Sequence, residues 1–80
     1  MKYIVFEDPS GLRYPILFPE VIGHDMIARS INAAYPGIRP VSAGFCSAHG
    51  GAWGNSVSLG LKYNPVDDKQ LIMKTLGIEG

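Results

Sequence analysis

The chain has 80 residues, of which 46% are hydrophobic and 18% charged, and its seven basic and seven acidic side chains leave no formal net charge. This length makes one domain, residues 1–80, and the low charge for so small a body favours an apolar surface that meets a partner. The lysines and arginines are spread along the chain and form no basic stripe. We therefore expect no binding to nucleic acid.

The sequence also bears on the compartment. No apolar run approaches the roughly 20 residues of a membrane span. The opening MKYIVFEDP lacks the long apolar region of a signal peptide. The single cysteine cannot form an internal disulfide, which fits a reducing compartment. We therefore expect a cytoplasmic protein with no membrane partner.

The beginning of the chain predicts a β-hairpin. Residues 2–8 (KYIVFED) and 12–18 (LRYPILF) are rich in the aromatic and β-branched residues that favour strands. The DPSG segment between them has the chemistry of a tight turn. Because Pro15 cannot donate a hydrogen bond to a ladder, we expect the second strand to lie at an edge of the sheet.

A helix is expected next, from near His24 to Tyr35, and the Pro36-Gly37 pair should end it. Apolar side chains repeat in this segment at the spacing of a one-sided helix, at Ile27, Ile31, Ala34 and Tyr35.

The second half of the chain predicts the same order of elements. Strands are expected at 39–49 and 55–62, joined by the glycine-rich segment GGAWG. A helix should follow Asn64, an N-cap residue, and end at Gly77, which suits a left-handed C-cap. The predicted fold is α+β, with the order ββαββα, a mostly antiparallel four-stranded sheet and both helices on one face.

The later two strands are expected to have one apolar and one small-residue face. Alternation places Val41, Ala43, Phe45, Val57, Leu59 and Leu61 on the apolar face, and Ser42, Gly44, Cys46, Ser56, Ser58 and Gly60 on the other. Such a face allows another backbone or a flat ring to come close. It could be a plain solvent face, a protein contact or a small-molecule platform.

Several residues invite chemical interpretations. Cys46 and His49 could form a thiolate–imidazole pair, but positions three apart on a strand face opposite sides. With His24 and Asp25 they show no metal-ligand spacing, so we expect no catalytic site, metal or cofactor. The N–H groups near Gly50 and Gly51 could cradle an anion, or these glycines could simply form a turn.

Trp53 is the most informative aromatic residue, because a tryptophan in a glycine-rich loop either anchors an interface or folds over the end of the sheet. Tyr3 and Tyr14 are further candidate anchors beside it.

The segments RPVSAGFCS, SVSLGL and NPVDDKQLI, within residues 39–72, resemble a pattern found in small bacteriophage and prophage proteins. The opening KYIVFED and PILFPE are also similar, although Asn64 stands where those proteins often carry an arginine. The resemblance implies a phage gene and a bacterial host cytoplasm, and it transfers no catalytic motif. Some small phage proteins bind the host's immune machinery, and anti-CRISPR proteins are one such group.

Together these observations predict a non-enzymatic module that binds a host protein or a second copy of itself. The expected contact residues are Trp53, Tyr3, Tyr14, Ser42, Cys46, Ser56, Ser58, His49, Gly50 and Gly51. One alternative is a dimeric sponge that holds a nucleotide-like anion between glycine-rich loops. A weaker alternative is a cysteine-dependent or metal-dependent enzyme.

Overall fold

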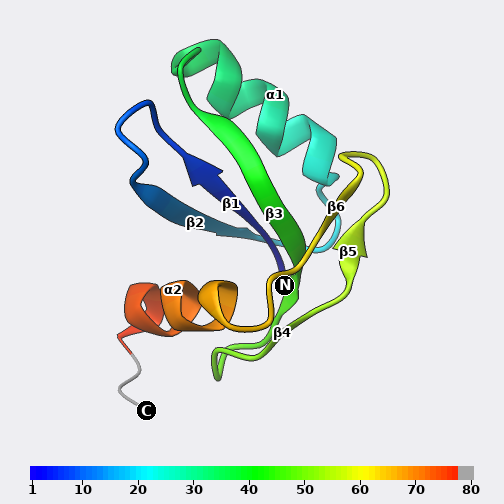
Figure 1. The fold of residues 1–80 in the computed structure, drawn as a ribbon. Coiled ribbons are helices and arrows are strands. Elements are labelled where there is room, and N and C mark those ends of the chain that lie inside the picture. Colours follow the sequence, from blue (N-terminus) through cyan, green and yellow to red (C-terminus); the bar gives the residue numbers. More distant parts are fainter. Residues whose placement is uncertain (78–80) are drawn as a thin grey trace.

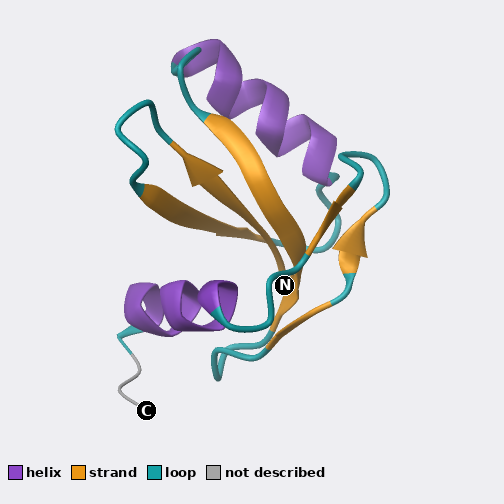
Figure 2. Cartoon of the chain, in the orientation of Figure 1, coloured by secondary structure: helices purple, strands orange, loops and turns teal. Residues whose placement is uncertain are grey.

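A computed structural model describes residues 1–77 and shows a twisted sheet between two helices (Figures 1 and 2). The elements in chain order are β1 (Lys2–Glu7), β2 (Arg13–Phe18), α1 (His24–Ala34), β3 (Arg39–Cys46), β4 (Ala52–Trp53), β5 (Asn55–Ser56), β6 (Leu61–Lys62) and α2 (Asp67–Leu76).

The main sheet has four antiparallel strands in the order β2-β1-β3-β4. β1 is therefore a central strand, hydrogen-bonded along its length to β2 on one side and β3 on the other. This architecture confirms the predicted α+β class, with a four-stranded antiparallel sheet and two helices.

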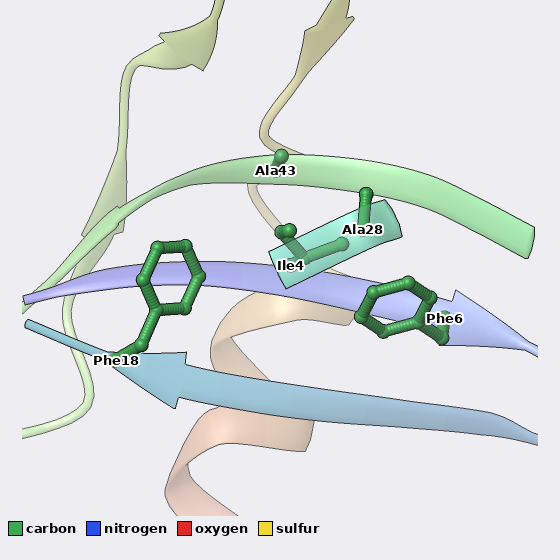
Figure 3. Close-up of a cluster of buried hydrophobic side chains, with 5 residues drawn as sticks. All are labelled: Ile4, Phe6, Phe18, Ala28 and Ala43. Carbon is green, nitrogen blue, oxygen red and sulfur yellow. The ribbon is translucent and has the colours of Figure 1, made fainter. Parts of the chain in front are cut away.

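The position of the helices differs from the prediction, because one helix covers each face of the sheet (Figure 1). Ala28 of α1 packs with Ile4, Phe6, Phe18 and Ala43 on one face, as Figure 3 shows, and these residues form the α1 core. The opposite face carries the α2 core, made of Tyr3, Val5, Cys46 and Ile72. The physical reason lies in β1, whose consecutive residues Tyr3, Ile4, Val5 and Phe6 are all apolar, so that both faces need cover.

The fourth strand is also not the one predicted. Residues 52–53 pair with β3, whereas residues 55–62 form the separate hairpin β5–β6. Gly54 has a φ of 79°, which an L side chain rarely adopts, and the strand pairing with β3 ends there, after Trp53. The carbonyl of Trp53 approaches Gly44 so closely that a Cβ there would collide with it.

The β5–β6 hairpin lies along β3 beyond the short β4 (Figure 1). Leu61 packs with the α1 core and Tyr63 with the α2 core, so the chain crosses the edge of β3 between them. Val57 was expected on the apolar face with Leu59 and Leu61, but it is 87% exposed in the turn of the hairpin.

β2 forms the other edge of the sheet, as Pro15 predicted. The N–H of Asp8 donates to the carbonyl of Leu12 at 3.0 Å, and antiparallel hydrogen-bonded pairs alternate from there along the strand. Pro15 falls at a position that faces away from β1, where its missing N–H removes nothing from the ladder. Neither helix of residues 1–77 is long and apolar enough to cross a membrane.

Candidate functional site

The β3 part of the small-residue face is an interior surface, covered by α2. Ser42, Cys46 and Ser56 are all buried, and so is Tyr3 of β1. These four predicted contact residues cannot reach a partner unless α2 or the β5–β6 hairpin moves. Ser42 donates a hydrogen bond to Asp68 of α2, and Gly44 leaves room for the Trp53 carbonyl, so parts of this chain rather than a second protein lie close to the strand.

A buried carboxylate fixes α2 to this face. Asp68 is 1% exposed and accepts hydrogen bonds from the Tyr3 hydroxyl at 2.6 Å and the Ser42 hydroxyl at 2.8 Å. The backbone N–H of Asn64 donates to the same carboxylate at 2.7 Å. Asp68 also lies in the first turn of α2, where the helix dipole favours a negative charge. The three donors and the dipole together replace the water that the carboxylate lost.

Burial changes the acidity of two neighbouring groups. It raises the pKa of the Tyr3 hydroxyl far above its usual value, and the hydrogen bond to Asp68 and the negative charge of that carboxylate add to the effect. Burial also raises the pKa of the Cys46 thiol. Both groups are therefore held in their neutral forms at physiological pH.

The environment of Cys46 is the opposite of what nucleophilic catalysis requires. A reactive cysteine is partly exposed and has a lowered pKa, whereas this thiol is 1% exposed and its pKa is raised. His49 lies in the turn after β3, exposed to solvent. No group of three or more metal-ligating side chains comes together within residues 1–77.

The other histidine belongs to the α1 core. His24 is 5% exposed, and its Nε2 lies 3.0 Å from the carbonyl oxygen of Gly44. Because a carbonyl only accepts, Nε2 carries the proton. The ring makes edge contacts with Phe18 and Phe45, so His24 joins α1 to the sheet.

The N–H groups of the glycine-rich turn are already engaged. The hydroxyl of Ser47 accepts hydrogen bonds from the backbone N–H groups of His49 and Gly51, at 3.3 Å and 3.1 Å. The N–H of Gly50 donates to the carbonyl of Ser47 at 3.1 Å, and Gly50 itself packs against Met73 of α2. An anion would have to displace these bonds to use the turn as a cradle.

Trp53 remains accessible, with half of its side-chain surface exposed. It pairs with Phe45 across β3 and β4 and lies over Gly51, which has no side chain to interfere. Tyr14 on β2 is 41% exposed, and its hydroxyl donates to Asp8 at 3.0 Å. Ser58 is exposed in the hairpin turn, beside the buried Ser56. The accessible predicted residues thus lie on separate elements, with Tyr14 and Trp53 on the two edge strands of the main sheet and Ser58 in the hairpin turn.

A groove that was not predicted from the sequence lies between the start of β2 and α2. It has a volume of about 480 Å³ and is lined by Gly11, Leu12, Arg13, Asp67, Gln70, Leu71 and Lys74. The four α2 residues follow the i, i+3, i+4, i+7 spacing of one helix face, a signal present in the sequence. Only the position of α2 on the sheet shows that this face borders a groove.

Comparisons of the chain with protein-family models, with curated proteins and with solved structures gave no significant match.

Proposed function

We propose that this protein is a non-enzymatic protein-binding module, and that Trp53 anchors its contact with a bacterial host protein. The observation that carries the proposal is the half-exposed indole of Trp53 on the two-residue edge strand β4. A large aromatic side chain in water has a free-energy cost that burial in an interface removes. Tryptophan is also among the residues most enriched at the energetic centres of interfaces.

The setting of Trp53 supports this role. The residue is held by strand pairing with Phe45, and its ring lies over Gly51. A partner would therefore meet a side chain that has already lost part of its rotational freedom, which lowers the entropic cost of association. The resemblance to phage proteins adds the class of partner, a protein of the bacterial host such as a component of its immune defence. We place the complex in the host cytoplasm.

The expected loss on truncation follows from the exposed area. A tryptophan buries about 150–250 Å² when covered, so half-exposure leaves roughly 100 Å² for a partner. At about 25 cal/mol per Å² this area contributes about 2.5 kcal/mol, which corresponds to a roughly 60-fold change in affinity.

The test is affinity capture from a bacterial lysate, followed by titration of the captured protein against purified variants. Trp53→Ala should weaken binding by tens of fold, whereas Tyr35→Ala should bind like the wild type. Tyr35 is the matched control because it is an exposed aromatic residue, 61% accessible, at the end of α1. Circular dichroism checks that both variants are folded, and Trp53→Lys serves if the alanine variant is not. Equal binding by the Trp53 and Tyr35 variants would refute the proposal.

A further inference from the structure

The groove between β2 and α2 opens where the helix leaves the sheet uncovered. α2 packs over the centre of the α2 core, at Tyr3 and Val5, and the groove lies toward the β1–β2 turn. Leu12 borders it with 56% of its side chain exposed, and Leu71 of α2 is partly buried beside it. The groove therefore offers an apolar surface that the fold itself does not cover.

The β1–β2 wall of the groove is rigid. Asp8 accepts hydrogen bonds from the backbone N–H groups of Ser10 and Leu12, at 2.9 Å and 3.0 Å, and from the Ser10 hydroxyl at 2.6 Å. Its other oxygen accepts the Tyr14 hydroxyl. These bonds hold the turn that carries Leu12, so little conformational entropy is lost when a ligand meets this wall.

The α2 wall is fixed by the buried hydrogen bonds of Asp68. The groove side of α2 carries Asp67 in the first turn and Lys74 in the last turn, with Gln70 and Leu71 between them. These two charges are seven residues apart, which spans about 10 Å along a helix. An extended segment of three or four residues covers the same length.

The charges around the groove favour an acidic ligand. Arg13 and Lys74 line it against a single acid, Asp67. Lys74 has no ion-pair partner among residues 1–77. Arg13 uses its Nε on Glu7 at 2.9 Å, but the same carboxylate is shared with Arg39 at 2.9 Å. The groove lining itself therefore carries one more basic than acidic side chain.

The backbone of β2 offers a further point of recognition. Hydrogen-bonded pairs with β1 alternate from the Asp8–Leu12 pair, so the N–H and carbonyl of Arg13 face away from β1. An extended peptide can pair with such an edge by adding a short strand. Pro15 has no N–H to offer two residues later, which limits the added strand to the neighbourhood of Arg13.

We propose that this groove binds an extended peptide segment that carries a large apolar side chain and, two residues away, a carboxylate side chain. The peptide pairs with β2 at Arg13, its apolar side chain contacts Leu71, and its carboxylate lies near Arg13 and Lys74. The spacing of two follows from the strand, because residues i and i+2 share a face. This site uses none of the residues of the Trp53 surface and does not depend on it.

The probe is the synthetic peptide acetyl-Thr-Leu-Thr-Glu-Thr-amide, titrated into the isotope-labelled full chain by NMR and calorimetry. We expect a dissociation constant below about 1 mM, with backbone shifts at residues 11–13 and 67–74. Replacing the peptide's Glu by Gln, or its Leu by Ser, should weaken binding. So should placing Leu and Glu next to each other, because they then point to opposite faces of the strand.

Variants of the protein separate this site from others. Lys74→Ala should weaken binding about three- to fivefold. The matched control is Lys69→Ala, on the same helix but outside the groove lining. No binding of the peptide at millimolar concentration would overturn the proposal, as would equal binding by the Lys74 and Lys69 variants. Shifts centred on Trp53 would assign the peptide to the other surface. N-acetylleucine binding as tightly as the peptide would show that strand pairing is not used.

Discussion

The most informative stability test is the removal of the buried carboxylate by Asp68→Ala. This change leaves two hydroxyl donors, on Tyr3 and Ser42, without an acceptor in the interior. The third donor, the N–H of Asn64, is partly accessible to water. Each buried donor left unsatisfied costs about 1–3 kcal/mol. We therefore expect a loss of roughly 3–5 kcal/mol in the free energy of unfolding, a large part of the stability of a domain this size.

Two further variants provide losses of unfolding free energy against which Asp68→Ala is compared. In Asp68→Asn, the side-chain carbonyl oxygen can still accept the hydrogen bonds of the Tyr3 hydroxyl and the Asn64 N–H. The amide NH2 then faces the Ser42 hydroxyl, which can accept a hydrogen bond as well as donate one. Its loss should be about 1–2 kcal/mol, because the bonds remain but are no longer charge-assisted. Asp67→Ala, on the exposed side of α2, is the matched control and should change stability by about 0.5 kcal/mol.

Urea denaturation followed by circular dichroism measures all three variants. The reasoning is refuted if Asp68→Ala lies within about 1 kcal/mol of the Asp67 control. It is equally refuted if Asp68→Ala stabilises the protein, since the desolvation of the carboxylate would then outweigh its hydrogen bonds.

Three other results are expected. The pKa of Tyr3 is higher in the folded protein than in the unfolded chain. The stability that its neutral form contributes is therefore complete below pH 10 and is lost as the pH rises above it. A spectrophotometric titration should show one tyrosine that ionises only when the protein unfolds. Cys46 should react with a thiol reagent at least tenfold more slowly in the native protein than in denaturant, whereas equal rates would contradict its burial. Gly44→Ala should lower the free energy of unfolding by about 1–3 kcal/mol, because its Cβ would collide with the Trp53 carbonyl; an unchanged denaturation midpoint would show that β4 simply moves aside.

Much of the fold could be predicted from local chemistry. The first two strands, the tight turn between them and the first helix follow from residue types whose preferences act over a few positions. Pro15 placed its strand at an edge, because a missing N–H has the same consequence in any sheet.

The predictions that were wrong concern residues whose arrangement depends on long-range packing. Alternation in residues 55–62 suggested a strand, but Gly54 and Gly60, with φ values of 79° and 65°, turn the segment into its own small hairpin. The small-residue face was expected to be accessible because nothing local says which face of a sheet a helix covers. The continuous apolar run of β1 was the available sign that both faces are buried.

The prediction of contact residues depended most on which face of the sheet α2 covers. Tyr3, Ser42 and Cys46 became interior once α2 was placed on their face, and Ser56 is buried in the β5–β6 hairpin. Asp68 was not singled out from the sequence, since a burial of 99% depends on the sheet beneath it. Trp53 was interpreted from its glycine-rich surroundings, and the structure shows it half exposed.

The hydrogen bond between Tyr3 and Asp68 joins residues 65 positions apart. A contact that closes so long a loop has a high entropic cost and tends to form late in folding, after the local β1–β2 hairpin. Interactions absent from the folding transition state act mainly on the rate of unfolding. We therefore expect the buried aspartate to govern how long the native protein survives before it opens, with little influence on how fast the chain first folds.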